Sequence, residues 1–251
     1  MVNQIAPDFI LQGNRIDIWS CESDALQGKQ AEYFSLLSDE EKQRAQRFKF
    51  DIHRNQFIAF HGFMRMVLAQ YLKIAPQEII YSKGEKGKPF IDMPTNSISP
   101  IQFNLSHTQT VALLAVTLEK DVGIDIEHID RKTDWKGICQ RFFTEPEQKA
   151  LFSLDKSQQE HAFYTLWTRK EAYMKVLGTG LSLSPTEFTL TVPPKAPALI
   201  EHHSNNIDAC NTVQFMDVLL PETFKNFCAT LAVSGANPGA IASHHFYQFS
   251  D

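Results

Sequence analysis

The spacing of apolar residues predicts two long helices, one over residues 56–72 and one over residues 161–177. In the first segment, apolar side chains recur every three or four positions, at Phe57, Phe60, Met64, Val67, Leu68 and Tyr71. That spacing is typical of a helix that buries one face in a core. The second segment has the same amphipathic pattern and ends before Gly178, a residue type that commonly caps helix C-termini.

Shorter elements are predicted around these two helices. Ser38 and Glu41 have the spacing of a capping box, so we expect a helix from Ser38 to about Phe48. Two more short helices are expected over residues 138–143 and 145–154. Alternating or continuously apolar segments predict strands at residues 15–20, 101–105, 111–118, 121–127, 188–192, 213–220 and 227–233. Strands accompany one long helix in each half of the chain, which permits a duplicated architecture.

The predicted strand at residues 121–127 carries two acids in an otherwise apolar segment, Asp125 and Glu127. Side chains two positions apart in a strand point to the same face, so both carboxylates would lie side by side. Such a pair is unfavourable unless a cation lies between the two charges. Carboxylate oxygens suit a hard divalent ion, and Mg²⁺ is the first candidate. A solvated acidic strand end is the alternative.

The composition is ordinary for a soluble globular protein, with 43% hydrophobic and 21% charged residues in a chain of 251. This length suits one large domain or two small ones. The net charge of −5 argues against charge-driven binding to nucleic acid or to an acidic membrane.

The cysteines and the apolar runs bear on the cellular setting. The four cysteines, Cys21, Cys139, Cys210 and Cys228, are far apart, so neither a zinc knuckle nor a redox motif is expected. No apolar run approaches the 18 residues of a membrane span, and residues 1–10 lack the pattern of a signal peptide. We therefore expect a reduced, cytoplasmic protein.

Ser106 and His107 lie where the strand at residues 101–105 is predicted to enter a turn. Adjacent side chains rarely converge, so the pair does not form a nucleophile and its general base. A hydroxyl and an imidazolium would suit a phosphate instead. The alternative is a turn serine beside an ordinary surface histidine.

The helix predicted at residues 161–177 carries Lys170, Glu171 and Lys175. Glu171 and Lys175 share a face and could form a simple surface ion pair. Trp167, four residues before Glu171, would place a large aromatic side chain on the same stripe and partly shield the site. A third carboxylate from this helix would then complete a metal-ligand set with Asp125 and Glu127.

Two basic segments could contact a small polyanion. The first has few acids and contains Lys42, Arg44, Arg47, Lys49 and Arg54. It is either a solvated helix face or a phosphate-binding patch, since arginine pairs bidentately with phosphate. The second, residues 83–89, lacks the glycine spacing and the Ser or Thr of a P-loop, although Lys88 could contact a phosphate from a turn.

The order of these clusters resembles the 4′-phosphopantetheinyl transferases of the larger, surfactin-synthetase-activating (Sfp) type. The resemblance extends over residues 38–182. The matching motifs are Gly87-Lys-Pro89, Phe103-Asn-Leu-Ser-His107, Gly123-Ile-Asp-Ile-Glu127, Arg141-Phe-Phe143 with Glu147, Trp167-x-x-Lys-Glu-Ala-x-x-Lys175 and Gly178-x-Gly-Leu-Ser182.

The resemblance implies two similar α+β halves, residues 1–120 and 121–251, with the active site in the cleft between them. The first half would hold the nucleotide of coenzyme A, and the second would supply the Mg²⁺ site, the long helix and the carrier-docking surface. The implied reaction moves the phosphopantetheine arm of coenzyme A to a serine of an apo acyl or peptidyl carrier protein. Adenosine 3′,5′-bisphosphate would be released.

The resemblance also implies residue roles. The Mg²⁺ ligands would be Asp125, Glu127 and Glu171. The phosphate contacts would be Arg44, Arg54, Lys88, Ser106, His107, Lys170 and Lys175. Glu171 or, as a second candidate, Glu147 would accept the proton of the attacking serine. Glu41 departs from the family because a basic residue is expected there, and Lys42 lies one place later.

Several alternatives stay open at this point. The chain could be a non-catalytic coenzyme A binding module, although such a module needs no three carboxylates beside a pyrophosphate. A Mg²⁺-dependent nuclease or phosphatase would leave the Gly-Lys-Pro and Ser-His motifs unexplained. Acidic carriers would dock on basic or apolar surface, for which residues 141–144 are a candidate. A monomer is expected, and the sequence does not indicate the pathway.

Overall fold

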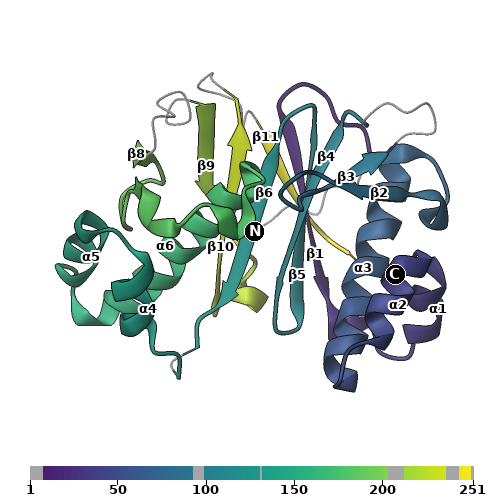
Figure 1. Ribbon diagram of the computed structural model, residues 1–251, viewed down its shortest axis with the longest axis horizontal. Helices are drawn as coiled ribbons and strands as arrows, with labels where there is room; N and C mark the ends of the chain where they lie inside the picture. Colours follow the sequence, from purple (N-terminus) through teal and green to yellow (C-terminus); the bar gives the residue numbers. More distant parts are fainter. Residues whose placement is uncertain (1–7, 93–98, 131, 203–211, 236–242, 250–251) are drawn as a thin grey trace. The chain divides into compact units, whose positions relative to one another are not determined.

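The computed structural model describes residues 8–92, 99–130, 132–202, 212–235 and 243–249. The chain forms two compact units (Figure 1). Unit 1 contains Met1–Lys83, Pro89–Glu119 and Ser243–Asp251. Unit 2 contains Gly84–Lys88 and Lys120–Ala242.

Unit 1 is built on a four-stranded sheet with the strand order β11-β1-β5-β4. Its strands are β1 (Arg15–Glu22), β4 (Ile101–Thr108), β5 (Val111–Leu118) and β11 (Ser243–Gln248). Neighbours pair antiparallel except β1 and β11, which pair parallel. A separate hairpin is formed by β2 (Ile80–Lys83) and β3 (Pro89–Asp92).

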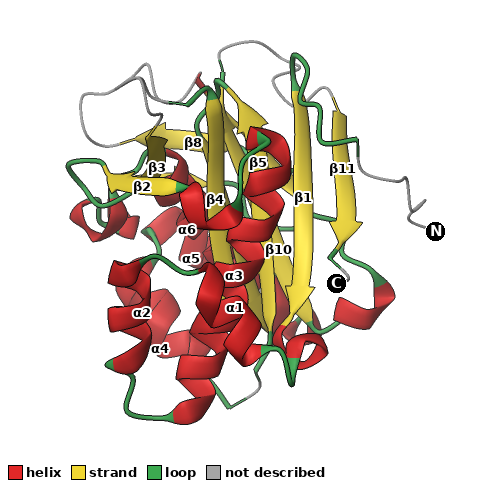
Figure 2. Cartoon of the chain, turned by 90° about the vertical axis from the view of Figure 1, so that its right-hand side faces the viewer, coloured by secondary structure: helices red, strands yellow, loops and turns green. Residues whose placement is uncertain are grey.

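Three helices cover one face of this sheet, as Figure 2 shows. They are α1 (Gln30–Leu36), α2 (Asp39–Gln46) and α3 (Asp51–Leu72). The predicted helix at Ser38 is confirmed, with both hydrogen bonds of its capping box present. Helix α3 begins five residues before the predicted start and buries Phe60 and Phe63 completely. Its apolar stripe forms the core with the inner side chains of β1, β4 and β5.

Unit 2 has a three-stranded antiparallel sheet with the order β6-β10-β9. Its strands are β6 (Val122–His128), β9 (Val213–Asp217) and β10 (Phe227–Ser234). The long helix α6 (Lys156–Val176) packs on this sheet. The remaining elements are α4 (Trp135–Phe142), α5 (Glu145–Phe152) and the hairpin of β7 (Phe188–Leu190) and β8 (Leu199–His202).

Five single-turn 3₁₀ helices connect these elements in the described residues. They are η1 (Ser23–Leu26), η2 (Pro76–Glu78), η3 (Gly180–Ser182), η4 (Pro185–Glu187) and η5 (Glu222–Phe224). No helix within the described ranges is both long and apolar enough to cross a membrane.

The α+β prediction is confirmed, since each unit packs one long helix against a sheet. Apart from a shift of the boundary by one residue, to Glu119 and Lys120, the grouping differs from a division between residues 120 and 121 in two segments. Strand β11 pairs with β1 and so belongs to unit 1, while the loop Gly84–Lys88 belongs to unit 2. Both involve contacts between segments far apart in sequence, which local patterns do not indicate.

Candidate active site

Gly123 allows α6 to approach the backbone of β6 closely. A Cβ atom at this position would lie 2.2 Å from the carbonyl oxygen of Ala172 and 2.5 Å from the amide nitrogen of Val176. Real Cβ contacts do not come this close, so any larger residue would push the helix away. The glycine of the Gly-Ile-Asp-Ile-Glu motif therefore sets the distance between strand and helix.

Asp125, two residues further along β6, meets α6 directly. It is only 4% exposed, and its Oδ1 accepts a hydrogen bond of 2.6 Å from Lys175 Nζ. Lys175 also donates to the carbonyl oxygen of Ile124 at 3.1 Å. The lysine predicted to contact phosphate thus lies beside the carboxylate predicted to hold Mg²⁺.

Glu171 lies close enough to Asp125 and Lys175 for both charges to affect its pKa. Burial raises its pKa, the charge of Asp125 raises the pKa further, and Lys175 partly opposes both effects. Two carboxyl groups with one ammonium group near them form an environment that additional positive charge would stabilise. The structure therefore brings together three of the predicted site residues, Asp125, Glu171 and Lys175.

Glu127 shares a face of β6 with Asp125, because it is two residues further along the strand. Its partner in the register with β10 is Cys228. Among the described residues, no three His, Cys, Asp or Glu side chains are placed as a metal-holding group. Mg²⁺ is commonly held by one or two carboxylates together with water and substrate phosphate. Asp125 and Glu171 fit that requirement by their donor chemistry and their proximity.

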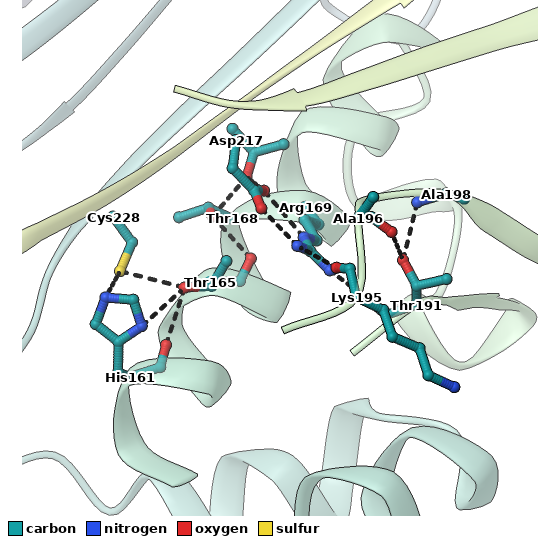
Figure 3. Close-up of polar contacts among 11 residues, drawn as sticks. His161, Thr165, Thr168, Arg169, Thr191, Lys195, Ala196, Ala198, Asp217 and Cys228 are labelled. Carbon is teal, nitrogen blue, oxygen red and sulfur yellow. Dashed lines mark hydrogen bonds and ion pairs between the residues drawn. The ribbon is translucent and has the colours of Figure 1, made fainter. Parts of the chain in front are cut away.

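A polar seam fixes α6 on the sheet of unit 2, as Figure 3 shows. Arg169 forms an ion pair with Asp217 of β9 and donates to the carbonyl oxygens of Thr191 and Lys195. Thr168 shares a hydrogen bond of 2.9 Å with Thr230 of β10. These residues have no counterpart among the predicted site residues, and their role is to hold the helix that carries Glu171.

Lys170 and Glu147 lie in the interior of unit 2, and both side chains have an exposed fraction of 0%. Lys170 Nζ forms an ion pair with Glu147 Oε1 at 2.9 Å and donates to two carbonyl oxygens. The placement does not support phosphate binding by Lys170 or proton transfer by Glu147, since every contact given above is internal. Glu147 follows Thr144 at capping-box spacing, a signal in the sequence that pointed to this structural role.

Ser106 and His107 lie within β4, whereas a turn was predicted there. The strand continues to Thr108, and the reversal occurs at Gln109 and Thr110. Adjacent strand residues point to opposite faces, so the two side chains diverge. Ser106 is buried, while the exposed His107 has its ring centroid 5.0 Å from that of Phe60 on α3.

The predicted arginine contacts lie in the segment of α2 and α3. The Arg44 guanidinium lies 5.2 Å from the ring centroid of Phe57. Arg54 pairs with Asp51 at 3.2 Å, and its side chain is 41% exposed. Lys42 pairs with Asp39 at 3.9 Å.

Glu41, the departure from the family pattern, is a structural residue. It closes the capping box of α2 and pairs with Arg65 at 2.7 Å and His61 at 2.8 Å. Burial alone would raise its pKa. The hydrogen bonds from His61 and Ser38 and the charge of Arg65 outweigh burial and lower the pKa of Glu41 to about 2.

Lys88 caps the C-terminus of α6 in unit 2. Its Nζ donates to the carbonyl oxygen of Val176 at 3.0 Å and pairs with Asp121 at 2.8 Å. A cation at this end of a helix is stabilised by the helix dipole. A phosphate contact by Lys88 would add to this role or replace it.

The surface proposed for carrier docking at residues 141–144 is less exposed than its sequence indicated. Phe143 and Thr144 are buried, and Phe142 packs at 5.8 Å against Trp167. Arg141 is exposed and lies over the Phe142 ring. The exposed part of this segment is therefore Arg141, with Phe142 half-buried.

Comparison with known families agrees with this arrangement of motifs. Residues 121–232 match the 4′-phosphopantetheinyl transferase superfamily. Residues 22–119 match the family described as 4′-phosphopantetheinyl transferase, N-terminal. The chain belongs to the two-domain, Sfp-type 4′-phosphopantetheinyl transferases.

Individual relatives are similar over most of the chain. The 4′-phosphopantetheinyl transferase HetI of Nostoc sp. is 34% identical over 196 residues, which is 78% of this chain and 81% of that protein. The 4′-phosphopantetheinyl transferase Sfp of Bacillus subtilis is 32% identical over 67% of this chain and 72% of its own length. A vertebrate relative, the L-aminoadipate-semialdehyde dehydrogenase-phosphopantetheinyl transferase of Xenopus laevis, is 30% identical over 70% of this chain and 62% of its own length.

Proposed function

We propose that this transferase moves the 4′-phosphopantetheine arm of coenzyme A to a serine of an apo carrier protein in a Mg²⁺-dependent reaction. Adenosine 3′,5′-bisphosphate is the by-product. The observation that carries the proposal is the cluster of Asp125, Glu171 and Lys175 within a chain of this family. Carboxylates and an ammonium group together suit a substrate pyrophosphate with its metal ion.

Asp125 and Glu171 would hold the Mg²⁺, with Glu127 from the same strand face as the third ligand. The metal would supply positive charge to offset the charge of the pyrophosphate. Lys175 adds a second positive charge at the same place. Its side chain is 26% exposed, so it can turn from Asp125 towards a phosphate oxygen.

Glu171 is the proposed general base for the serine hydroxyl. A carboxylate that α6 holds beside the reacting pyrophosphate can accept the proton of the attacking hydroxyl. Glu147, the second candidate, has no place in this proposal because its carboxylate is buried against Lys170.

The other assignments remain predictions. Arg44, Arg54, Lys88, Ser106 and His107 are proposed phosphate contacts of coenzyme A, and Glu41 supplies no cation to the segment that contains Arg44 and Arg54. A cytoplasmic, monomeric protein also stays a prediction.

The proposal is tested by incubating the purified protein with coenzyme A, Mg²⁺ and several apo carrier proteins. Mass spectrometry should show a gain of one phosphopantetheine arm on a carrier serine, and adenosine 3′,5′-bisphosphate should appear in equal amount. Removing metal with EDTA should stop the gain, and adding Mg²⁺ should restore it. Coenzyme A binding without any mass gain would instead identify a non-catalytic binding module.

A further inference from the structure

The side chain next to the proposed general base is fixed by three acceptors. Lys170 Nζ donates to Glu147 Oε1 at 2.9 Å, to the carbonyl oxygen of Pro185 at 2.7 Å and to that of Phe188 at 2.9 Å. An ammonium group has three N–H donors, so each donor has its acceptor. The Phe188 ring also lies 4.3 Å from Nζ and covers the ammonium group.

Glu147 is fixed in the same way by donors from three elements. Its Oε1 accepts from Lys170 of α6 and from the backbone N–H of Leu190 in β7 at 2.8 Å. Its Oε2 accepts from the backbone N–H of Thr144 at the start of α5, also at 2.8 Å. Rotation of α6 about its axis would break this set of bonds, because neither side chain can follow the movement.

Other anchors of α6 differ from this pair. The contact at Gly123 involves no side chain on the strand, so it limits distance more than rotation. Arg169 is also buried and has three acceptors, but its ion-pair partner Asp217 is 38% exposed. In the pair of Lys170 and Glu147 both charged side chains are completely buried.

Energetics also favour a role in specifying geometry. A buried ion pair often gives no more stability than well-packed apolar side chains of the same size, since desolvation offsets the attraction. Its distinct property is that it satisfies its partners in one arrangement only. In this chain the buried pair includes Lys170, the residue directly before Glu171.

We propose that Glu147 and Lys170 are positioning residues: their buried pair sets the rotation of α6 and so places Glu171 beside Asp125. The inference rests on the proposed function, in which Glu171 contacts the metal and the serine proton. A rotation of about 10° would move a side-chain end by about 1 Å at the surface of a helix about 10–12 Å across. Displacements of that size cost up to about 10²-fold in rate.

The test uses Glu147→Gln, which keeps the acceptor for Leu190 and removes the charge that holds Lys170. Its Mn²⁺ dissociation constant, measured by electron paramagnetic resonance with saturating coenzyme A, should rise about tenfold. The kcat for carrier modification should fall about tenfold or more, while the KM for coenzyme A stays within about twofold. Circular dichroism should show the sample fully folded at the assay temperature.

A matched control separates positioning from general loss of stability. Arg65→Met breaks a comparable buried pair with Glu41 in unit 1 and should lower Tm to a similar degree. Its Mn²⁺ dissociation constant should remain that of the wild type. If Glu147→Gln binds Mn²⁺ and turns over like the wild type, or if both variants weaken Mn²⁺ equally, the positioning role is overturned.

Failure of the two proposals gives different results. A wild-type protein that neither binds Mn²⁺ with coenzyme A nor modifies any carrier contradicts the proposed function. A wild type that does both, together with an unaffected Glu147→Gln, contradicts the positioning role alone. Should Glu147→Gln fail to fold, Lys170→Gln takes its place, because the amide retains donors for the carbonyl oxygens of Pro185 and Phe188.

Discussion

Two carboxylate clusters in this chain contain similar groups and behave differently. In unit 1, Glu41 is held by Arg65, His61 and the start of α2, and its pKa falls to about 2. In unit 2, Asp125 and Glu171 lie near one lysine, and the pKa of Glu171 rises. The first cluster has enough fixed positive charge for its acid, whereas the second has two acids for one cation.

The difference separates a structural site from the proposed reactive one. Arg65 is buried, so Glu41 holds α2 on α3 in a single arrangement. Lys175 is partly exposed, and the proposed function assigns a metal ion and the serine proton to the cluster it belongs to. Excess negative charge, rather than burial alone, therefore distinguishes the proposed catalytic cluster from its structural counterpart.

The comparison would be broken most directly at Asp125. Asp125→Asn should lower the rate of carrier modification by about 10²–10³-fold, because the charge that attracts the cation is lost. The loss in unfolding free energy should be smaller than for Glu41→Gln, since the repulsion on Glu171 is also relieved. Mass spectrometry of the carrier measures the rate, and urea denaturation measures the free energy of unfolding. A variant that is less stable but modifies the carrier at the wild-type rate would contradict the role proposed for Asp125.

Glu171→Gln should lower kcat by about 10²-fold, because the amide cannot accept the serine proton. Coenzyme A should still bind, as calorimetry would show. The control is Glu145→Gln, since Glu145 lies at the surface in an exposed pair with Lys149 and should leave kcat unchanged. Equal rates for the wild type and Glu171→Gln would remove Glu171 from the chemistry.

Glu41→Gln should reduce the unfolding free energy at pH 7 by about 3 kcal/mol, since each tenfold change in proton affinity corresponds to about 1.4 kcal/mol. The pKa of Glu41 is lower in the folded protein than its ordinary value of 4.5. Its contribution is therefore present above about pH 4.5 and is lost as the pH falls towards 2. Urea denaturation across this range should show wild type and variant converging, and a constant difference would point to packing instead.

Gly123→Ala should cost about 1–3 kcal/mol of unfolding free energy, because the new methyl group forces α6 away from β6. The rate of carrier modification should fall as well, since Asp125 and Glu171 separate. Gly84→Ala is the control, because its Cβ would lie at an ordinary 3.6 Å from the nearest atom. Thermal unfolding and the carrier assay measure the two effects. The prediction would be contradicted if Gly123→Ala had the same stability and the same rate as the wild type and Gly84→Ala.

Local patterns predicted the main elements and left the long-range contacts open. The apolar spacing of α3 and α6 and the capping box at Ser38 indicated real helices. Helix α1 was missed because it buries only Tyr33, and β11 was missed because its Ser-His-His start lacks apolar alternation.

The site could be predicted in residue type but not in detail. The strand period placed Asp125 and Glu127 on one face, and the family motif indicated Glu171. Neither signal could distinguish the buried Lys170 from the partly exposed Lys175, because both lysines lie on one helix and differ only in what packs against them. The burial of Lys170 depends on Glu147 and on the carbonyl oxygens of Pro185 and Phe188, and no local pattern indicates these contacts.

The parallel pairing of β11 with β1 has a consequence for synthesis of the chain on the ribosome. Most of unit 1 is translated first, yet its sheet receives Ser243–Gln248 only after all of unit 2 has been made. Until then β1 has a free edge, which other nascent chains or chaperones can pair with. The first unit to be translated is thus the last to be completed.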